Sequence, residues 1–202
     1  RGEKLILVFG PEGCGKTTLI RSACASCRLN LTNDPANPGD KVVLVEDADE
    51  VEGLEPLIRG CLSRGARAVV LETSHPARLA HLVEKLDVRK AVYVPPPDKA
   101  ARLALLSQAL ADQLPPHLVQ RLADQTSSYS LRALIELAEH VRRSLRRGAA
   151  PEEAVREALD AVKPDLTPLS AAEVEDFIQT YKGVVAGFMP RTAKLISPHP
   201  PP

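Results

Sequence analysis

The fold of this chain is decided by Gly10-Pro11-Glu12-Gly13-Cys14-Gly15-Lys16-Thr17, which matches the phosphate-binding pattern G-x-x-x-x-G-K-[ST]. The apolar run from Leu5 to Phe9 in front of it is typical of a buried strand, and residues 16 to about 26 behind it can continue as a helix. Strand, glycine loop and helix form the context that this motif needs. The stretch therefore predicts a site for the phosphates of a nucleoside triphosphate.

The expected chemistry follows from the backbone. Glycines allow a tight turn in which successive N–H groups point into one concavity, and the start of the following helix adds partial positive charge. Lys16 is expected to reach the β- and γ-phosphates, and the Thr17 hydroxyl to ligate Mg²⁺. The predicted nucleotide-binding residues are Pro11, Glu12, Gly13, Cys14, Gly15, Lys16, Thr17 and Thr18.

Composition narrows the class of protein. The chain has 202 residues, with 26 basic and 26 acidic side chains. Because its formal net charge is zero, strong nonspecific binding to DNA is not indicated. No apolar run has the length of about 18 residues that a membrane span needs, and no signal peptide opens the chain, so we expect a cytoplasmic protein with no membrane partner. The four cysteines are too few for a disulfide framework, and we expect Cys24 and Cys27 to be idle thiols.

Further strands are expected after the glycine loop. Residues 42–45, 68–71 and 91–94 are apolar runs without polar alternation, which is typical of a parallel sheet covered on both faces. Helices are expected between them, at about 53–63 and 75–86. Residues 1–97 therefore predict a doubly wound α/β domain with a parallel sheet.

The pattern changes after the prolines at 95–97. Asp98 and Ser130 are typical helix N-caps, and Ser170 to Glu173 resembles a capping box ahead of an apolar helix face. We expect residues 98–186 to form a small all-helical domain, and residues 187–202 an extended, proline-rich tail.

Polar residues follow two of the predicted strands, at the sheet edge where ligands bind in open α/β folds. Glu46 and Asp47 are candidates for the Mg²⁺ shell and for polarising an attacking water, although acids in this position can also cap the next helix. Thr73 or Ser74 is a candidate for a hydrogen bond to the γ-phosphate or to that water, and the alternative is a simple strand-end cap.

Residues 4 to about 180 resemble an AAA+ ATPase, a nucleotide-binding core followed by a helical lid. The glycine loop resembles Walker A, residues 42–47 resemble Walker B, Thr73-Ser74 falls at sensor 1, residues 93–103 are similar to the segment that joins core and lid, and Ser130-Leu131-Arg132 looks like sensor 2. The resemblance implies ATP and ADP as ligands, with Mg²⁺. It also implies an ATPase that assembles into a ring of identical subunits and remodels a protein partner.

The same resemblance implies a role for each site residue. Thr17 and Glu46 would manage the metal, Asp47 would orient the water, and Thr73 and Arg132 would sense the γ-phosphate. The family usually ends Walker B in Asp-Glu, whereas here the order is Glu46-Asp47, and the shorter Asp47 side chain predicts slow or absent hydrolysis. Two alternatives stay open: a clamp-loader-like ATPase that acts on DNA, and a scaffold subunit that holds ATP without turnover.

Other departures concern segments rather than single acids. No arginine lies at the family's usual arginine-finger position, and Arg89 and Arg78 are the nearest candidates. Residues 29–40 are too short for the strand and helix that the family places before Walker B, so we expect a break in the chain, with residues missing, between Leu29 and Asp40. The first strand starts so early that we also expect a preceding N-terminal segment to be missing.

Overall fold

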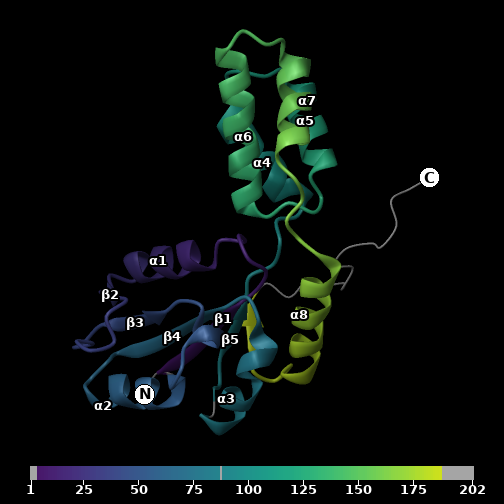
Figure 1. Cartoon of the computed structure of the whole chain (residues 1–202). Helices are drawn as coiled ribbons and strands as arrows, with labels where there is room; N and C mark the ends of the chain where they lie inside the picture. The colour runs from purple at the N-terminus through teal and green to yellow at the C-terminus, as the bar shows by residue number, and fades with distance from the viewer. Residues whose placement is uncertain (1–3, 87, 188–202) are drawn as a thin grey trace. The chain divides into compact units, whose positions relative to one another are not determined.

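The computed structural model describes residues 4–86 and 88–187, and these residues form two compact units. One is an α/β unit, made of the described parts of residues 1–11, 15–95 and 168–202. The other is a helical unit, made of residues 96–167 together with residues 12–14 of the glycine loop. Figure 1 labels the helices and strands of both units.

The α/β unit is built on a six-stranded sheet in the order β2-β3-β4-β1-β5-β6, and every neighbouring pair is parallel. Apolar strands without polar alternation produce such a sheet because both faces are covered. The predicted doubly wound α/β fold is therefore confirmed. The strand bounds are β1 Leu5–Phe9, β2 Leu31–Thr32, β3 Val42–Val45, β4 Ala68–Thr73, β5 Ala91–Tyr93 and β6 Val185–Gly187.

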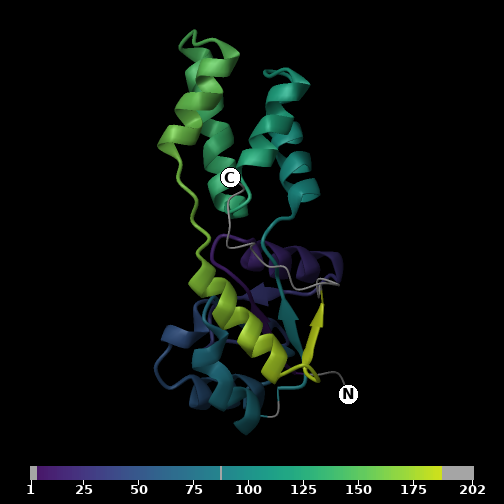
Figure 2. The same ribbon diagram turned by 90° about the vertical axis from the view of Figure 1, so that its right-hand side faces the viewer.

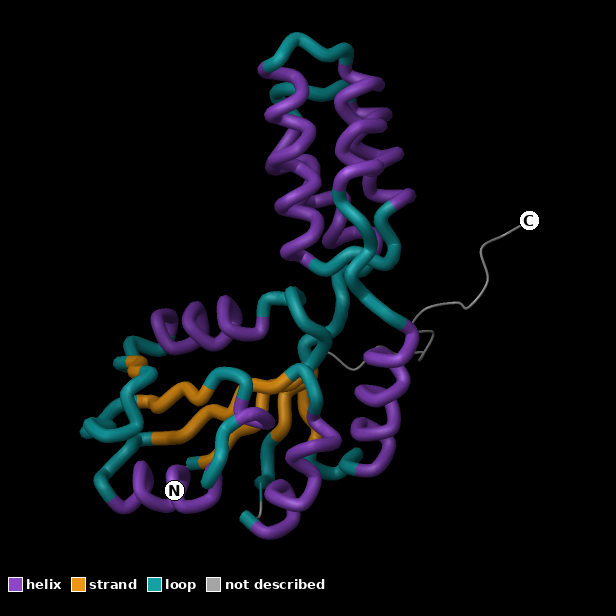
Figure 3. The backbone as a smooth tube through the Cα atoms, viewed as in Figure 1, coloured by secondary structure: helices purple, strands orange, loops and turns teal. Residues whose placement is uncertain are grey.

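Helices cover both faces of this sheet, with α1 on one side and α2 and α3 on the other (Figure 3). The segment expected to be one helix over 75–86 is a 3₁₀ turn, η2, followed by the short helix α3. A second 3₁₀ turn, η1, follows β3. The bounds are α1 Lys16–Ser26, α2 Leu54–Ser63, α3 Ala80–Lys85, η1 Ala48–Glu50 and η2 Pro76–Leu79.

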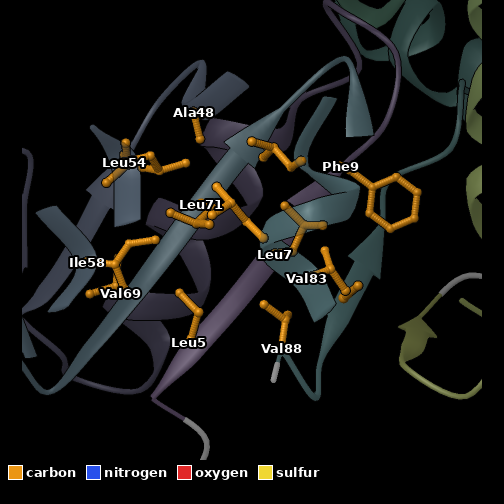
Figure 4. Packing of buried hydrophobic residues seen from close by; sticks show 14 of the residues in the cluster. Leu5, Leu7, Phe9, Ala48, Leu54, Ile58, Val69, Leu71, Val83 and Val88 are labelled. Atoms are coloured by element: carbon orange, nitrogen blue, oxygen red, sulfur yellow. The ribbon is translucent and has the colours of Figure 1, made fainter. Parts of the chain in front are cut away.

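The core of the α/β unit comes from alternate residues of the strands. Leu5, Leu7 and Phe9 of β1 and Val69 and Leu71 of β4 point to the face that α2 and α3 cover, as Figure 4 shows. Successive side chains of a strand point to opposite faces, so the intervening residues of β4 face α1. This alternation fixes which β4 side chains can meet the start of α1.

The short interval between α1 and β3 forms a loop, and the break expected between Leu29 and Asp40 stays a prediction. The two-residue strand β2 pairs with β3, and a loop without a helix joins them. Asp34 shapes this loop: its carboxylate accepts hydrogen bonds from the Ala36 backbone at 2.9 Å and the Asn37 side chain at 3.0 Å, and these bonds lower the pKa of Asp34. A compact turn thus lies where the resembling family has a full helix.

The last part of the chain differs from its predicted place. Helix α8, Pro168–Thr180, and strand β6 belong to the α/β unit, not to the helical domain expected over 98–186 (Figure 2). The reason is hydrophobic: Phe177 packs against Phe9 and Tyr181, with ring centroids 4.9 and 4.7 Å apart. Strand β6 then adds to the sheet edge beside β5. The predicted tail, except for Gly187 at its start, lies outside the described residues.

The helical unit has four helices around an apolar core of its own: α4 Lys99–Leu110, α5 Pro116–Gln125, α6 Leu131–Arg146 and α7 Pro151–Ala161. Asp98 and Ser130 cap α4 and α6 as predicted, by accepting hydrogen bonds from Ala101 N at 2.7 Å and Ala133 N at 3.2 Å. The buried Arg102 guanidinium donates to the carbonyls of Pro97 and Ala123, which fixes the start of α4 on α5.

Candidate functional site

The glycine loop leaves β1 in a conformation that needs glycine. Gly10 has φ of 150°, and a Cβ at this position would lie 2.1 Å from the carbonyl oxygen of Val94, which follows β5. The backbone of two neighbouring parallel strands therefore closes on the loop at its first residue. The loop leads directly into α1, with Gly15 as its N-cap, so the strand, loop and helix predicted from the motif are all present.

Lys16 is held inside this turn, with only 5% of its surface exposed. Its ammonium donates to the carbonyl oxygens of Gly10 and Pro11, at 3.0 and 3.1 Å, and to the Ser74 hydroxyl at 2.9 Å. Ser74 follows the end of β4, so the lysine links the glycine loop to the neighbouring strand end. A buried cation beside the amides of a helix start is a favourable place for an anion.

Thr17 is paired with a carboxylate that the sequence did not single out. Its hydroxyl lies 2.8 Å from both carboxylate oxygens of Glu72, which is the next-to-last residue of β4. Burial raises the pKa of the Glu72 carboxyl, and the nearby charges of Glu46 and Asp47 add to the rise, whereas the Thr17 hydrogen bond and Lys16 oppose it. Three carboxylates thus share this edge of the sheet.

Glu46 and Asp47 follow β3 as expected, but neither supplies the carboxylate that pairs with the Thr17 hydroxyl. Glu46 is partly exposed and accepts from Arg21 and Asn33, both at 3.1 Å. Asp47 is in the left-handed region, with φ of 45°, and begins the turn η1. Where the sequence predicts Glu46 beside Thr17, the structure has Glu72.

Thr73 and Ser74 lie in different surroundings. The Thr73 side chain is fully buried and donates to Asp49, whose other carboxylate oxygen accepts from Arg78 at 3.1 Å. Ser74, by contrast, is the hydroxyl that meets Lys16. Of the two candidates for sensor 1, it is therefore Ser74 that contacts the glycine-loop lysine, and Thr73 helps to fix the turn after β3.

This buried pair gives a stability prediction. Asp49→Ala is expected to lower the free energy of unfolding by about 2 kcal/mol, because the buried Thr73 hydroxyl loses its acceptor. Asp49→Asn is the matched control: it keeps a side-chain oxygen that can accept from Thr73 and is expected to cost about 1 kcal/mol or less. Urea denaturation of the three proteins measures this difference, and equal losses in the two variants would contradict it.

Arg132 belongs to the helical unit, as do residues 12–14. Its guanidinium forms an ion pair with Glu12 at 2.7 Å, and its backbone N–H donates to the Gly13 carbonyl at 3.1 Å. Ser130, two residues earlier, is buried and its hydroxyl lies 2.5 Å from Asp165. These contacts tie the start of α6 to the tip of the glycine loop, the part of the motif that also includes Cys14.

The sequence of this chain is similar to that of a known ATPase. The chain matches no protein-family profile. It is 27% identical, over 237 aligned positions, to the ATPase family gene 2 protein homolog B of Rattus norvegicus, an alignment that covers 81% of this chain. The chain spans about a third of that relative, 31% of its length.

Solved structures give a closer view of the fold. The crystal structure of the FIGL-1 AAA domain in complex with ADP superposes with a TM-score of 0.69 over 89% of this chain and 78% of that one, at 16% identity. A second FIGL-1 AAA domain structure gives 0.67 over 88% and 77%, again at 16% identity. The chain has the fold of an AAA+ ATPase core.

The two arginines considered as fingers have different surroundings. Arg78 is paired with Asp49, and Arg89 is exposed and follows α3. The assignment of an arginine finger stays a prediction.

Among residues 4–86 and 88–187, no helix is long and apolar enough to cross a membrane.

Sequence reasoning missed Glu72, Asp49 and the part that Ser74 plays. A signal for Glu72 is present in the sequence: it is the one charged residue of β4, and it directly follows the apolar run predicted as a strand over residues 68–71. A charged side chain inside a buried strand needs a partner, and this rule alone would have marked it for attention.

Proposed function

We propose that this AAA+ core binds ATP with Mg²⁺ and hydrolyses it to ADP and phosphate. The observation that carries the proposal is the buried Lys16 ammonium, held at the glycine loop and at the start of α1. The FIGL-1 AAA domain, which has the same fold, has been crystallised with ADP. Loop amides of residues 11–18 and Lys16 would hold the phosphates, as the motif requires.

The oxygen donors at the site fit the metal that such a nucleotide carries. A threonine hydroxyl and carboxylates are hard ligands of the kind that Mg²⁺ prefers. Within the part of the chain that the structure describes, no group of three or more acidic, histidine or cysteine side chains could hold a metal by itself. The metal would be held by Thr17, a carboxylate of the adjoining strand ends, and the phosphates. Bound there, Mg²⁺ would neutralise phosphate charge.

Further roles follow from position. Asp47 would orient the attacking water, Ser74 or Thr73 would contact the γ-phosphate side of the site, and Arg132 would sense it from the helical unit. We also propose, from the fold family alone, that the chain works in the cytoplasm in an oligomeric ring and that hydrolysis drives remodelling of a protein partner. Measuring the size of the protein with and without ATP tests the assembly.

One observation favours a second function, a scaffold subunit that binds ATP without turnover. The acid that follows β3 directly, Glu46, is engaged by Arg21 and Asn33, and the catalytic position has the shorter Asp47. A shift of about 1 Å in a reacting group can cost on the order of a hundredfold in rate.

The Asp47→Asn variant separates the two functions. If Asp47 acts as the base, ATP turnover is expected to fall by about 100-fold while ATP affinity stays unchanged, because Asn keeps the shape but cannot take a proton. Asp40→Asn, at an exposed acid paired with Arg67, is the matched control and should leave turnover unchanged. If the wild type and Asp47→Asn bind ATP alike and neither turns over, the scaffold function is supported.

A further inference from the structure

We propose that Glu72, rather than Glu46, is the carboxylate that holds the divalent cation of the bound nucleotide together with Thr17. This inference rests on the proposed function, because the cation arrives with the nucleotide. It places the carboxylate ligand of the metal on β4, the strand that leads to Ser74. It does not place this ligand directly after β3, where Glu46 and Asp47 lie.

The first argument is position. Glu72 lies opposite Val8 in the β1–β4 ladder. The next residue of β1 is Phe9, and the glycine loop begins directly after it. Its side chain points to the face of the sheet that α1 covers, because the neighbouring Leu71 and Thr73 point to the other face. Both carboxylate oxygens lie 2.8 Å from the Thr17 hydroxyl, the group that the motif assigns to Mg²⁺.

The second argument is burial. Glu72 is only 7% exposed, and the hydrogen bonds it makes within the described residues come from a neutral hydroxyl. Burying a carboxylate is costly unless a cation or several donors compensate it. Lys16 is nearby, but its ammonium donates to the carbonyls of Gly10 and Pro11 and to Ser74. The charge of Lys16 therefore compensates the buried carboxylate only in part, and a divalent cation at this point would add to that compensation.

The third argument is the contrast with Glu46. Its side chain is 40% exposed, and it already has a guanidinium partner in Arg21 and an amide donor in Asn33. A carboxylate that is solvated and ion-paired gains less from binding a cation than one that is buried beside a hydroxyl. Mg²⁺ is usually held by one or two carboxylates together with phosphates and water, so one well-placed acid is sufficient.

The test compares Glu72→Gln with Glu46→Gln in the full chain. Gln keeps the size of Glu and an oxygen that can accept from Thr17, so the fold is expected to survive, which thermal melting checks. ADP binding is measured by calorimetry in EDTA, and Mn²⁺ binding to the ADP complex is measured by electron paramagnetic resonance. Neither measurement depends on turnover.

We expect Glu72→Gln to weaken Mn²⁺ binding in the ADP complex by about 10- to 100-fold, while ADP affinity in EDTA stays within about threefold of the wild type. Glu46→Gln should change Mn²⁺ affinity by less than about threefold. Glu72→Asp, which retracts the carboxylate by one methylene, should give an intermediate loss, and it serves as the test if the Gln variant does not fold.

Two results would overturn the inference. Mn²⁺ affinity that is unchanged in the Glu72 variants, or lost mainly in Glu46→Gln, would return the metal to the acid after β3 and leave the proposed function intact. A wild-type protein that binds no ADP or ATP under any condition would overturn the proposed function and this inference together.

Discussion

Lys16→Ala is expected to weaken ATP binding by about 1,000-fold. The wild-type ammonium is buried at the glycine loop, where a triphosphate would receive hydrogen bonds from it at the β- and γ-phosphates. A hydrogen bond to a charged group contributes about 1.5–3 kcal/mol, and losing two of them amounts to roughly 4 kcal/mol, or three powers of ten in affinity. Isothermal titration calorimetry with ATP and Mg²⁺ measures the effect.

Lys99→Ala is the matched control, because Lys99 is an exposed lysine whose ion pair with Asp124 lies in the helical unit. It should bind ATP like the wild type. Thermal melting shows whether Lys16→Ala is folded, since this change also leaves the carbonyls of Gly10 and Pro11 without their donor. A folded Lys16→Ala protein with unchanged ATP affinity would exclude the glycine loop as the phosphate site.

Gly10→Ala is expected to lower the free energy of unfolding by about 4 kcal/mol, a large share of the roughly 5–15 kcal/mol that stabilises an ordinary protein. The added Cβ would lie 2.1 Å from the Val94 carbonyl oxygen and 3.1 Å from its carbon, and φ of 150° is unfavourable for any side chain. Relief would require β1 and the end of β5 to move apart, although Val94 N–H donates to Phe9 O at 2.8 Å.

Urea denaturation measures this loss, with Gly183→Ala as the control. A Cβ at Gly183 meets no atom within 4 Å, and its φ is not in the positive range, so this variant should stay within about 0.5 kcal/mol of the wild type. Wild-type stability in Gly10→Ala would mean that the strands do not close on the loop in solution as they do in the structure.

Local patterns were sufficient to predict much of the α/β unit. A few consecutive residues determine each of the features that were predicted correctly: the glycine loop, the apolar strand before it, and the helix caps at Asp98 and Ser130. These features form as predicted because they depend on interactions between side chains and backbone groups that are close in the sequence.

Features that depend on distant partners were not predicted. Thr17 and Glu72 are 55 residues apart, and only the pairing of β4 with β1 brings the strand to the start of α1. The spacing of Val174, Phe177 and Ile178 indicated a helix with an apolar face, but not that this face packs on the sheet. The composition of residues 29–40 indicated a loop, but not the turn that the Asp34 side chain makes within it.

The return of the chain through α8 and β6 has a consequence for how the protein can be divided. Residues 96–167 leave the α/β unit after β5 and rejoin it at α8, so this segment is an insertion with two covalent attachments. A fragment that stops at residue 97 would uncover Phe9 and leave β5 as an edge with unpaired peptide groups, which invites aggregation. A shortened chain that links residue 95 to residue 168 would instead keep all six strands together.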